Sequence, residues 1–126
     1  MTLPRHRIVV EARPQYLPEQ SDPAESRFVF AYQITIRNEG TVAAQLLTRH
    51  WFITDAHGNT EEVHGEGVVG EQPQIAPGES HTYMSGCPLA TSFGSMRGSY
   101  HFVDADGYGF EAEIPEFFLV GPRTLH

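Results

Sequence analysis

The sequence predicts an all-β fold, an antiparallel sandwich of the immunoglobulin-like or fibronectin type III-like kind. Three observations predict it. Large apolar residues alternate with smaller or polar ones, 12 glycines and 9 prolines punctuate the chain, and no segment of helical length carries a 3.6-residue apolar stripe. Short strands at close spacing without helices are typical of sandwiches and barrels. At 126 residues, we expect one domain spanning 1–126.

The clearest strand is the one in which every second residue is large and apolar: Phe28, Phe30, Tyr32, Ile34 and Ile36. Side chains on a strand alternate between faces, so this row should face the core. Residues 38–40, Asn-Glu-Gly, then end the strand in a turn. In chain order, the expected strands are residues 7–16, 28–37, 42–54, 60–63, 80–85, 96–102, 110–114 and 117–120. Residues 19–27 are interpreted as a polar connection.

Composition narrows the classes of function. Sixteen acidic residues against eight basic ones, all arginine, give a formal charge of −8. This balance disfavours nucleic acid as a partner, because phosphates require cationic side chains. The longest apolar run, Phe28 to Tyr32, is far short of the roughly 20 residues that cross a bilayer. No apolar stretch as long as the h-region of a signal peptide follows Met1 to Arg7, so we expect no secretory signal. A single cysteine, Cys87, fits a reducing cytoplasm.

A glycine-rich segment is the most distinctive motif: Gly65, Glu66, Gly67, Val68, Val69 and Gly70 read GxGxxG, followed by Glu71. In a dinucleotide-binding fold these glycines open a helix, but Pro73 and Pro77 follow too closely here. Three interpretations remain. The segment is a loop between the sheets with glycines at positive φ; or its N–H groups bind a small anion or a partner's carboxylate; or Glu66 and Glu71 bind a divalent cation.

Other reactive residues show no catalytic pattern. The seven histidines are scattered and lack the paired spacing of a zinc site: His6, His50, His57, His64, His81, His101 and His126. His64 and Glu66 would share one face of an extended chain, either as solvated groups or as a pair of metal ligands. Asp104 and Asp106 resemble the start of a calcium loop, but no glutamate follows at the twelfth position, so a hairpin turn is favoured.

Two further features concern packing. Cys87 is expected to be a buried apolar group, although a neighbouring histidine could activate it as a nucleophile. Trp51 is expected to anchor the core. Arg49 lies on the same strand face, where it could stack on an aromatic ring, pair with an acid or contribute a polar contact to a binding surface.

Several strings, taken together and in order, resemble the bacterial ApaG family over nearly the whole chain. They are YL at 16–17, EQSDP at 19–23, RHWFITD at 49–55, GEGVVGEQP at 65–73, PGE at 77–79, YMSGCPL at 83–89, MRGSY at 96–100 and IPEF at 114–117. The resemblance implies a fibronectin type III-like sandwich in a cytoplasmic bacterial protein. It also implies a link to cobalt and magnesium efflux or resistance, and a genetic association with diadenosine tetraphosphate hydrolase.

Related domains in eukaryotic F-box and polymerase-interacting proteins look like protein-binding modules. We therefore expect a non-enzymatic interaction or regulatory module with an unidentified protein partner. The alternative is direct binding of a divalent cation or a nucleoside polyphosphate at residues 65–71. Exposed edge strands would also allow two copies of the chain to pair.

Overall fold

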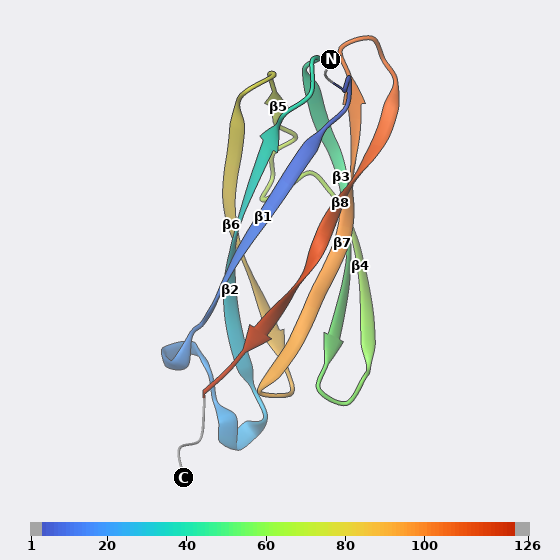
Figure 1. Cartoon of the computed structure of the whole chain (residues 1–126). Helices are drawn as coiled ribbons and strands as arrows, with labels where there is room; N and C mark the ends of the chain where they lie inside the picture. Colours follow the sequence, from blue (N-terminus) through green and yellow to red (C-terminus); the bar gives the residue numbers. More distant parts are fainter. Residues whose placement is uncertain (1–3, 123–126) are drawn as a thin grey trace.

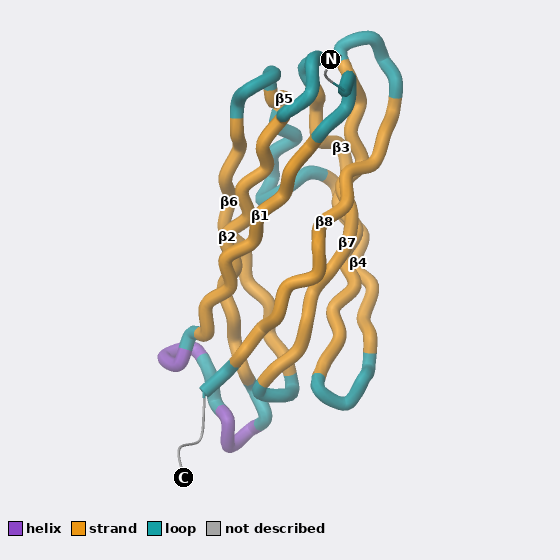
Figure 2. Tube along the Cα trace, in the orientation of Figure 1, coloured by secondary structure: helices purple, strands orange, loops and turns teal. Residues whose placement is uncertain are grey.

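Two antiparallel sheets face each other in the computed structural model, which describes residues 4–122 (Figures 1 and 2). Met1 and His126 lie outside these residues. The first sheet has the order β1-β2-β6, and its strands are β1 (Ile8–Tyr16), β2 (Phe28–Asn38) and β6 (Ser80–Leu89). The second has the order β4-β3-β7-β8, and its strands are β3 (Ala44–Asp55), β4 (Thr60–Glu66), β7 (Phe93–Asp104) and β8 (Gly109–Val120). The predicted all-β sandwich is confirmed.

The core lies between the sheets and is built by alternation. Phe30, Ile34 and Ile36 of β2 are fully buried, as the period-two pattern predicts. Trp51 of β3 is only 2% exposed and makes edge contacts with the rings of Tyr32 and Tyr100, so its predicted role as a core anchor is confirmed. The interior is thus filled by side chains that both layers contribute.

Two strand predictions were wrong. Residues 110–114 and 117–120 form the single strand β8, which passes through Pro115. The register with β7 shifts between Met96 and Gly98, so β8 carries one extra residue there, as in a β-bulge. Proline is tolerated because β8 is an edge strand and loses no essential ladder bond. The second error is the omission of β5 (Gln74–Ile75), a two-residue strand that pairs with the start of β3.

The connection between β1 and β2 is polar, as predicted. It contains two short 3-10 helices, η1 (Pro18–Gln20) and η2 (Pro23–Glu25), and neither has a buried residue. No helix within residues 4–122 combines the length and apolar character needed to span a membrane.

The two sides of the sandwich differ. On one side β1 of the first sheet packs beside β8 of the second, which closes the seam between the layers (Figure 1). On the other side lie the edge strands β6 and β4, each with one hydrogen-bonded neighbour among the described strands. The open side between β4 and β6 therefore gives access to the space between the sheets.

Candidate functional site

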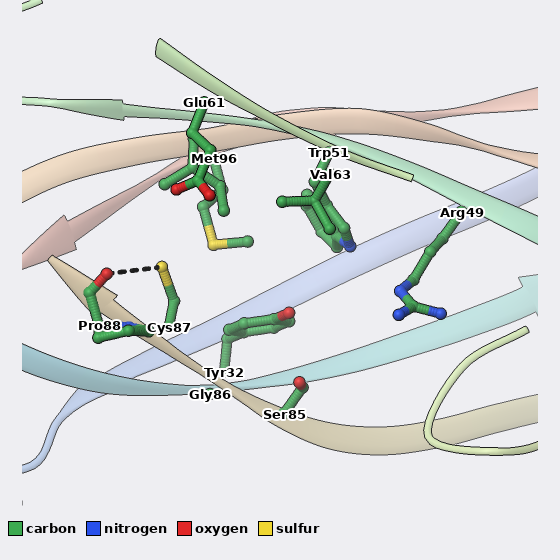
Figure 3. A pocket seen from close by; sticks show the side chains of 11 residues that line it. Tyr32, Arg49, Trp51, Glu61, Val63, Ser85, Gly86, Cys87, Pro88 and Met96 are labelled. Atoms are coloured by element: carbon green, nitrogen blue, oxygen red, sulfur yellow. Dashed lines mark hydrogen bonds between the residues drawn. The ribbon is translucent and has the colours of Figure 1, made fainter. Parts of the chain in front are cut away.

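A cleft opens between β4 and β6. It encloses about 300 Å³ and is lined by Tyr32, Arg49, Trp51, Ile53, Glu61, Val63, Ser85, Gly86, Cys87, Pro88 and Met96. Figure 3 shows Tyr32, Ser85 and Cys87 on one layer, facing Trp51, Val63 and Met96 on the other. Arg49 lies at one end and Glu61 at the opposite end, so an apolar middle is flanked by one positive and one negative charge.

Arg49 is held in place by the glycine-rich segment. Its Nη1 donates hydrogen bonds to the carbonyl oxygens of Glu66 and Gly67, both at 2.9 Å. A side chain at residue 65 would block this arrangement, because a Cβ there would lie 2.5 Å from the guanidinium carbon. Arg49 thus binds backbone carbonyls, rather than the aromatic ring or acidic partner that the sequence suggested.

The glycine-rich segment is part strand and part turn. Gly65 and Glu66 are the last residues of β4, so the interpretation of the whole motif as a loop was wrong at its start. Residues 67–70 do leave the strand, with Gly67 at φ +62° and Gly70 at φ +77°. No helix follows Gly70 within the described chain, which confirms that the motif does not have the dinucleotide-binding context.

Val69 occupies an unusual position at the tip of this turn. The N–H of Val68 donates to the carbonyl of Glu71 at 2.8 Å, and the N–H of Glu71 donates back at 3.0 Å. This reciprocal pair closes a two-residue hairpin turn over Val69 and Gly70, both with positive φ, as in a type I′ turn. Such turns favour asparagine, aspartate or glycine, whereas Val69 is β-branched, has φ +48° and is 64% exposed.

The same hydrogen bonds limit what the turn can bind. The N–H groups of Gly67, Val68 and Glu71 are bonded to backbone carbonyls of the protein. An anion could therefore use only the N–H groups of Val69 and Gly70, a smaller nest than the sequence suggested. The Glu71 carboxylate lies 3.7 Å from His81 Nε2. Within residues 4–122, neither Glu66 nor Glu71 belongs to a cluster of three metal-ligating side chains.

Three tyrosines lie near Arg49, and one of them, Tyr32, lines the cleft. The hydroxyl of Tyr83 on β6 is hydrogen-bonded to the hydroxyl of Tyr100 on β7. Burial raises the pKa of both hydroxyls above the ordinary value. The hydrogen bond with Tyr100 opposes this in part for Tyr83, and the positive charge of Arg49 opposes it slightly for both. Burial also raises the pKa of Tyr32. All three tyrosines are neutral hydrogen-bonding groups at physiological pH.

Cys87 faces the apolar part of the cleft. It is 4% exposed, and burial, with a smaller contribution from the Glu61 carboxylate, raises the pKa of its thiol to about 11. The thiolate is the nucleophilic form, so at neutral pH this side chain is a small, unreactive group. This agrees with the prediction of a buried apolar cysteine.

The Asp104 side chain is part of a hairpin turn, as predicted. Its Oδ1 accepts hydrogen bonds from the N–H groups of Asp106 and Tyr108, and its Oδ2 lies 2.7 Å from His6 Nε2 and 3.3 Å from Arg5 Nε. The hydrogen bond with His6 holds the pKa of this carboxyl well below its usual range, with help from the backbone donors and Arg5. Asp104 fastens the N-terminal segment to the β7–β8 turn.

Two residues at candidate sites were not singled out by the sequence analysis. Met84 on β6 is 58% exposed and lies with Val69 and Tyr83 around a smaller hollow next to Arg49. His50 lies directly opposite His64 across the β3–β4 ladder. The exposure of Met84 and the β3–β4 register both depend on the packed fold, and no local signal in the sequence reveals them.

Fold and site together define a small β-sandwich domain with an open interlayer cleft and a strained turn beside it. The chain belongs to the ApaG family, since the ApaG domain model matches residues 18–104, which include all the residues that line the cleft. Protein ApaG of Pseudomonas paraeruginosa is 58% identical over 122 residues, covering 97% of both chains. Protein ApaG of Nitrosomonas europaea is 56% identical, covering 97% of this chain and 96% of the relative.

A solved structure agrees with this assignment. The crystal structure of an ApaA protein from Bordetella pertussis superimposes with a TM-score of 0.93 at 50% identity, covering 98% of this chain and 100% of the other. The C-terminal domain of wzt, at 10% identity, reaches a TM-score of 0.50 and shares the fold alone.

Proposed function

We propose that this ApaG-family chain is a non-enzymatic, cytoplasmic interaction domain. It binds an extended segment of a protein partner along the free edge of β6, beside the Val69 turn. The link to cobalt and magnesium efflux or resistance that the family resemblance implies is then indirect, through a regulatory effect on that partner.

The observation that carries this proposal is the contrast between the two free edges. A long edge strand without charges can pair with another chain, and proteins usually block it with charged residues. β4 is protected in this way, because three of its seven residues are Glu61, Glu62 and Glu66. β6 has ten residues, none of them Asp, Glu, Lys or Arg, and it exposes Met84. An added strand on β6 is the simplest use of this edge.

The surroundings of β6 indicate the chemistry of the partner. An apolar side chain of the added strand would reach the cleft between Tyr32 and Trp51, and the exposed Val69 and Met84 would contact its neighbour. Arg49, at the end of the cleft, would favour an acidic side chain or a carboxylate. We therefore expect an extended, uncharged core sequence with one acidic residue beside it.

Strain at Val69 also supports a binding role. Residues held at unfavourable backbone angles concentrate at functional sites, where the rest of the fold compensates their cost. A valine in this turn destabilises the chain and exposes apolar surface, which a bound partner would cover. Asparagine or glycine would form the same turn with less strain. Contact between the Val69 side chain and a bound partner would explain why the turn has a valine.

A peptide selection tests the proposal. Random twelve-residue peptides are selected on the immobilised protein, and the affinity of a recovered peptide is measured by calorimetry. Amide shifts in a nitrogen-15 NMR titration should map to residues 84–89 of β6 and to Val69. Val69→Asn and Met84→Asn should each weaken binding about five- to tenfold, because each removes roughly 1 kcal/mol of apolar contact.

Val120→Asn is the matched control, since Val120 is a 54% exposed valine at the far end of β8. It should leave the affinity unchanged. Failure to select any peptide, or equal effects of all three variants, would contradict the proposal. Inorganic phosphate and diadenosine tetraphosphate are titrated in parallel. If either compound shifts the amide resonances of Val69 and Gly70 while no peptide binds, the alternative of a small ligand at residues 65–71 replaces the proposal of a protein partner. Self-association that Met84→Asn abolishes would identify a second copy as the added strand.

A further inference from the structure

The outer face of the β3–β4 hairpin, opposite the cleft, carries two histidines and a glutamate. His50 of β3 is directly opposite His64 of β4 in the strand register, and Glu62 precedes His64 by two residues on the same face. The Glu62 carboxylate oxygen lies 3.7 Å from His50 Nε2 and 3.5 Å from His64 Nε2. One donor atom from each of the three residues falls within 4.8 Å of the others.

Two observations separate this cluster from ordinary surface charges. His50 Nε2 is buried and has no hydrogen-bond partner among the described residues. Buried polar atoms are nearly always paired, so an orphaned one requires an explanation. The imidazole rings of His50 and His64 also stack, with centroids 3.8 Å apart and an angle of 23° between their planes. Two imidazoles are thereby stacked face to face next to one carboxylate.

We propose that His50, Glu62 and His64 bind a divalent transition-metal ion such as Zn²⁺ or Ni²⁺. Imidazole nitrogen suits these metals, and two histidines with one carboxylate form a three-ligand set that leaves a position for water or a partner's side chain. Mg²⁺ and Ca²⁺ prefer oxygen ligands, so this donor set selects against them.

For both histidines to bind one ion, their stacked rings must first move apart, because an imidazole binds a metal in the plane of its ring. Ligands about 2.1 Å from a tetrahedral metal are roughly 3.4 Å apart, close to the observed nitrogen–oxygen separations. His64 and Glu62 supply the flexibility, since their side chains are 67% and 54% exposed. Rotation of the His64 ring away from the stack would direct its Nε2 toward the ion. His50, at 29% exposure, is the fixed ligand.

One positive charge lies on the adjacent strand β7. Arg97 of β7, a neighbouring cation, is held 4.3 Å over the ring of Phe52. Phe52 stands between Glu62 and Arg97 in the strand ladders. The carboxylate of Glu66, which the sequence paired with His64, is not part of the cluster. The partners of His64 in the cluster are instead His50 on the adjacent strand and Glu62 on its own strand.

Calorimetric titration of the full chain, without an affinity tag, tests the site with ZnCl₂, NiCl₂ and MgCl₂. We expect one Zn²⁺ or Ni²⁺ per chain and no heat from Mg²⁺. His64→Ala and Glu62→Gln should each weaken Zn²⁺ binding at least tenfold, while His57→Ala, which removes an exposed histidine of the β3–β4 turn, should not. Zn²⁺ should also raise the melting temperature of the native chain more than that of His64→Ala.

Histidine side-chain NMR gives an independent readout. Zn²⁺ should shift the Nε2 resonances of His50 and His64 and leave those of His57 and His101 in place. Absence of binding at millimolar Zn²⁺ would overturn the proposal. Equal loss of affinity in His64→Ala and His57→Ala, or binding unchanged in His64→Ala and Glu62→Gln, would overturn it as well.

Discussion

Replacing Val69 with asparagine should stabilise the chain, although it removes an apolar side chain. A residue other than glycine in the left-handed region costs about 1–3 kcal/mol, and asparagine tolerates this region better than a β-branched residue does. The substitution loses little hydrophobic stabilisation. Full burial of a valine contributes roughly 1.5–3 kcal/mol, but Val69 is 64% exposed, so only a part of this is lost. The net gain should be about 1 kcal/mol, which corresponds to roughly 4 °C in Tm.

Urea unfolding followed by the fluorescence of Trp51 measures this gain. Trp51 is the only tryptophan and is 2% exposed, so its emission reports the opening of the core. The midpoint should rise without a change in the slope m. Ser26→Asn is the control, since Ser26 also has a positive φ of 55° but is not β-branched and should gain less. A lower midpoint for Val69→Asn would refute the strain argument. If Val69→Asn has a higher urea midpoint and also binds the peptide more weakly, stability and binding oppose each other at this turn.

Three further changes test the cleft and the N-terminal anchor. Gly65→Ala should force the Arg49 guanidinium aside and break its two carbonyl hydrogen bonds, which lowers the free energy of unfolding by about 1–2 kcal/mol in urea; unchanged stability would contradict this. Asp104→Asn should destabilise the chain at neutral pH. The hydrogen bond with His6 lowers the pKa of Asp104 in the folded chain. The carboxylate therefore stabilises the fold at pH values above its pKa in the unfolded chain, about 3.9, and this stabilisation is lost as the pH falls through its lower pKa in the folded chain. The Tm difference from the native chain should therefore narrow below about pH 4, and a constant difference would refute the assignment. Cys87, with a thiol pKa of about 11, should resist iodoacetamide at pH 8 until urea is added, and rapid labelling of the folded chain would contradict its burial.

Alternation made most of the fold predictable. Phe30, Ile34 and Ile36 are buried because a strand with one apolar face can be stable only when that face meets another layer. The exceptions arise where tertiary context overrides a local signal. Pro115 normally ends a strand, yet it is accepted in β8 because the strand is at an edge and bulges there. The two residues of β5 carry too short a pattern to be distinguished from a loop.

The candidate site was less predictable, since it depends on strand register. The sequence paired His64 with Glu66 by spacing along one strand, whereas the nearest imidazole belongs to His50 on the adjacent strand. A shift of one residue in the β3–β4 register would place His50 on the other face relative to His64. Spacing within a strand is readable from one sequence, but the pairing between strands is fixed by the turn and by the packed core.

The two proposed surfaces share one hairpin, and strand geometry keeps them apart. Adjacent residues of a strand point to opposite faces, so Arg49 and Trp51 face the cleft while His50 between them faces outward. β4 follows the same rule, with Glu61 and Val63 lining the cleft and Glu62 in the outer cluster. A substitution that removes a metal ligand therefore leaves the residues that line the cleft in place, which allows the two proposals to fail separately.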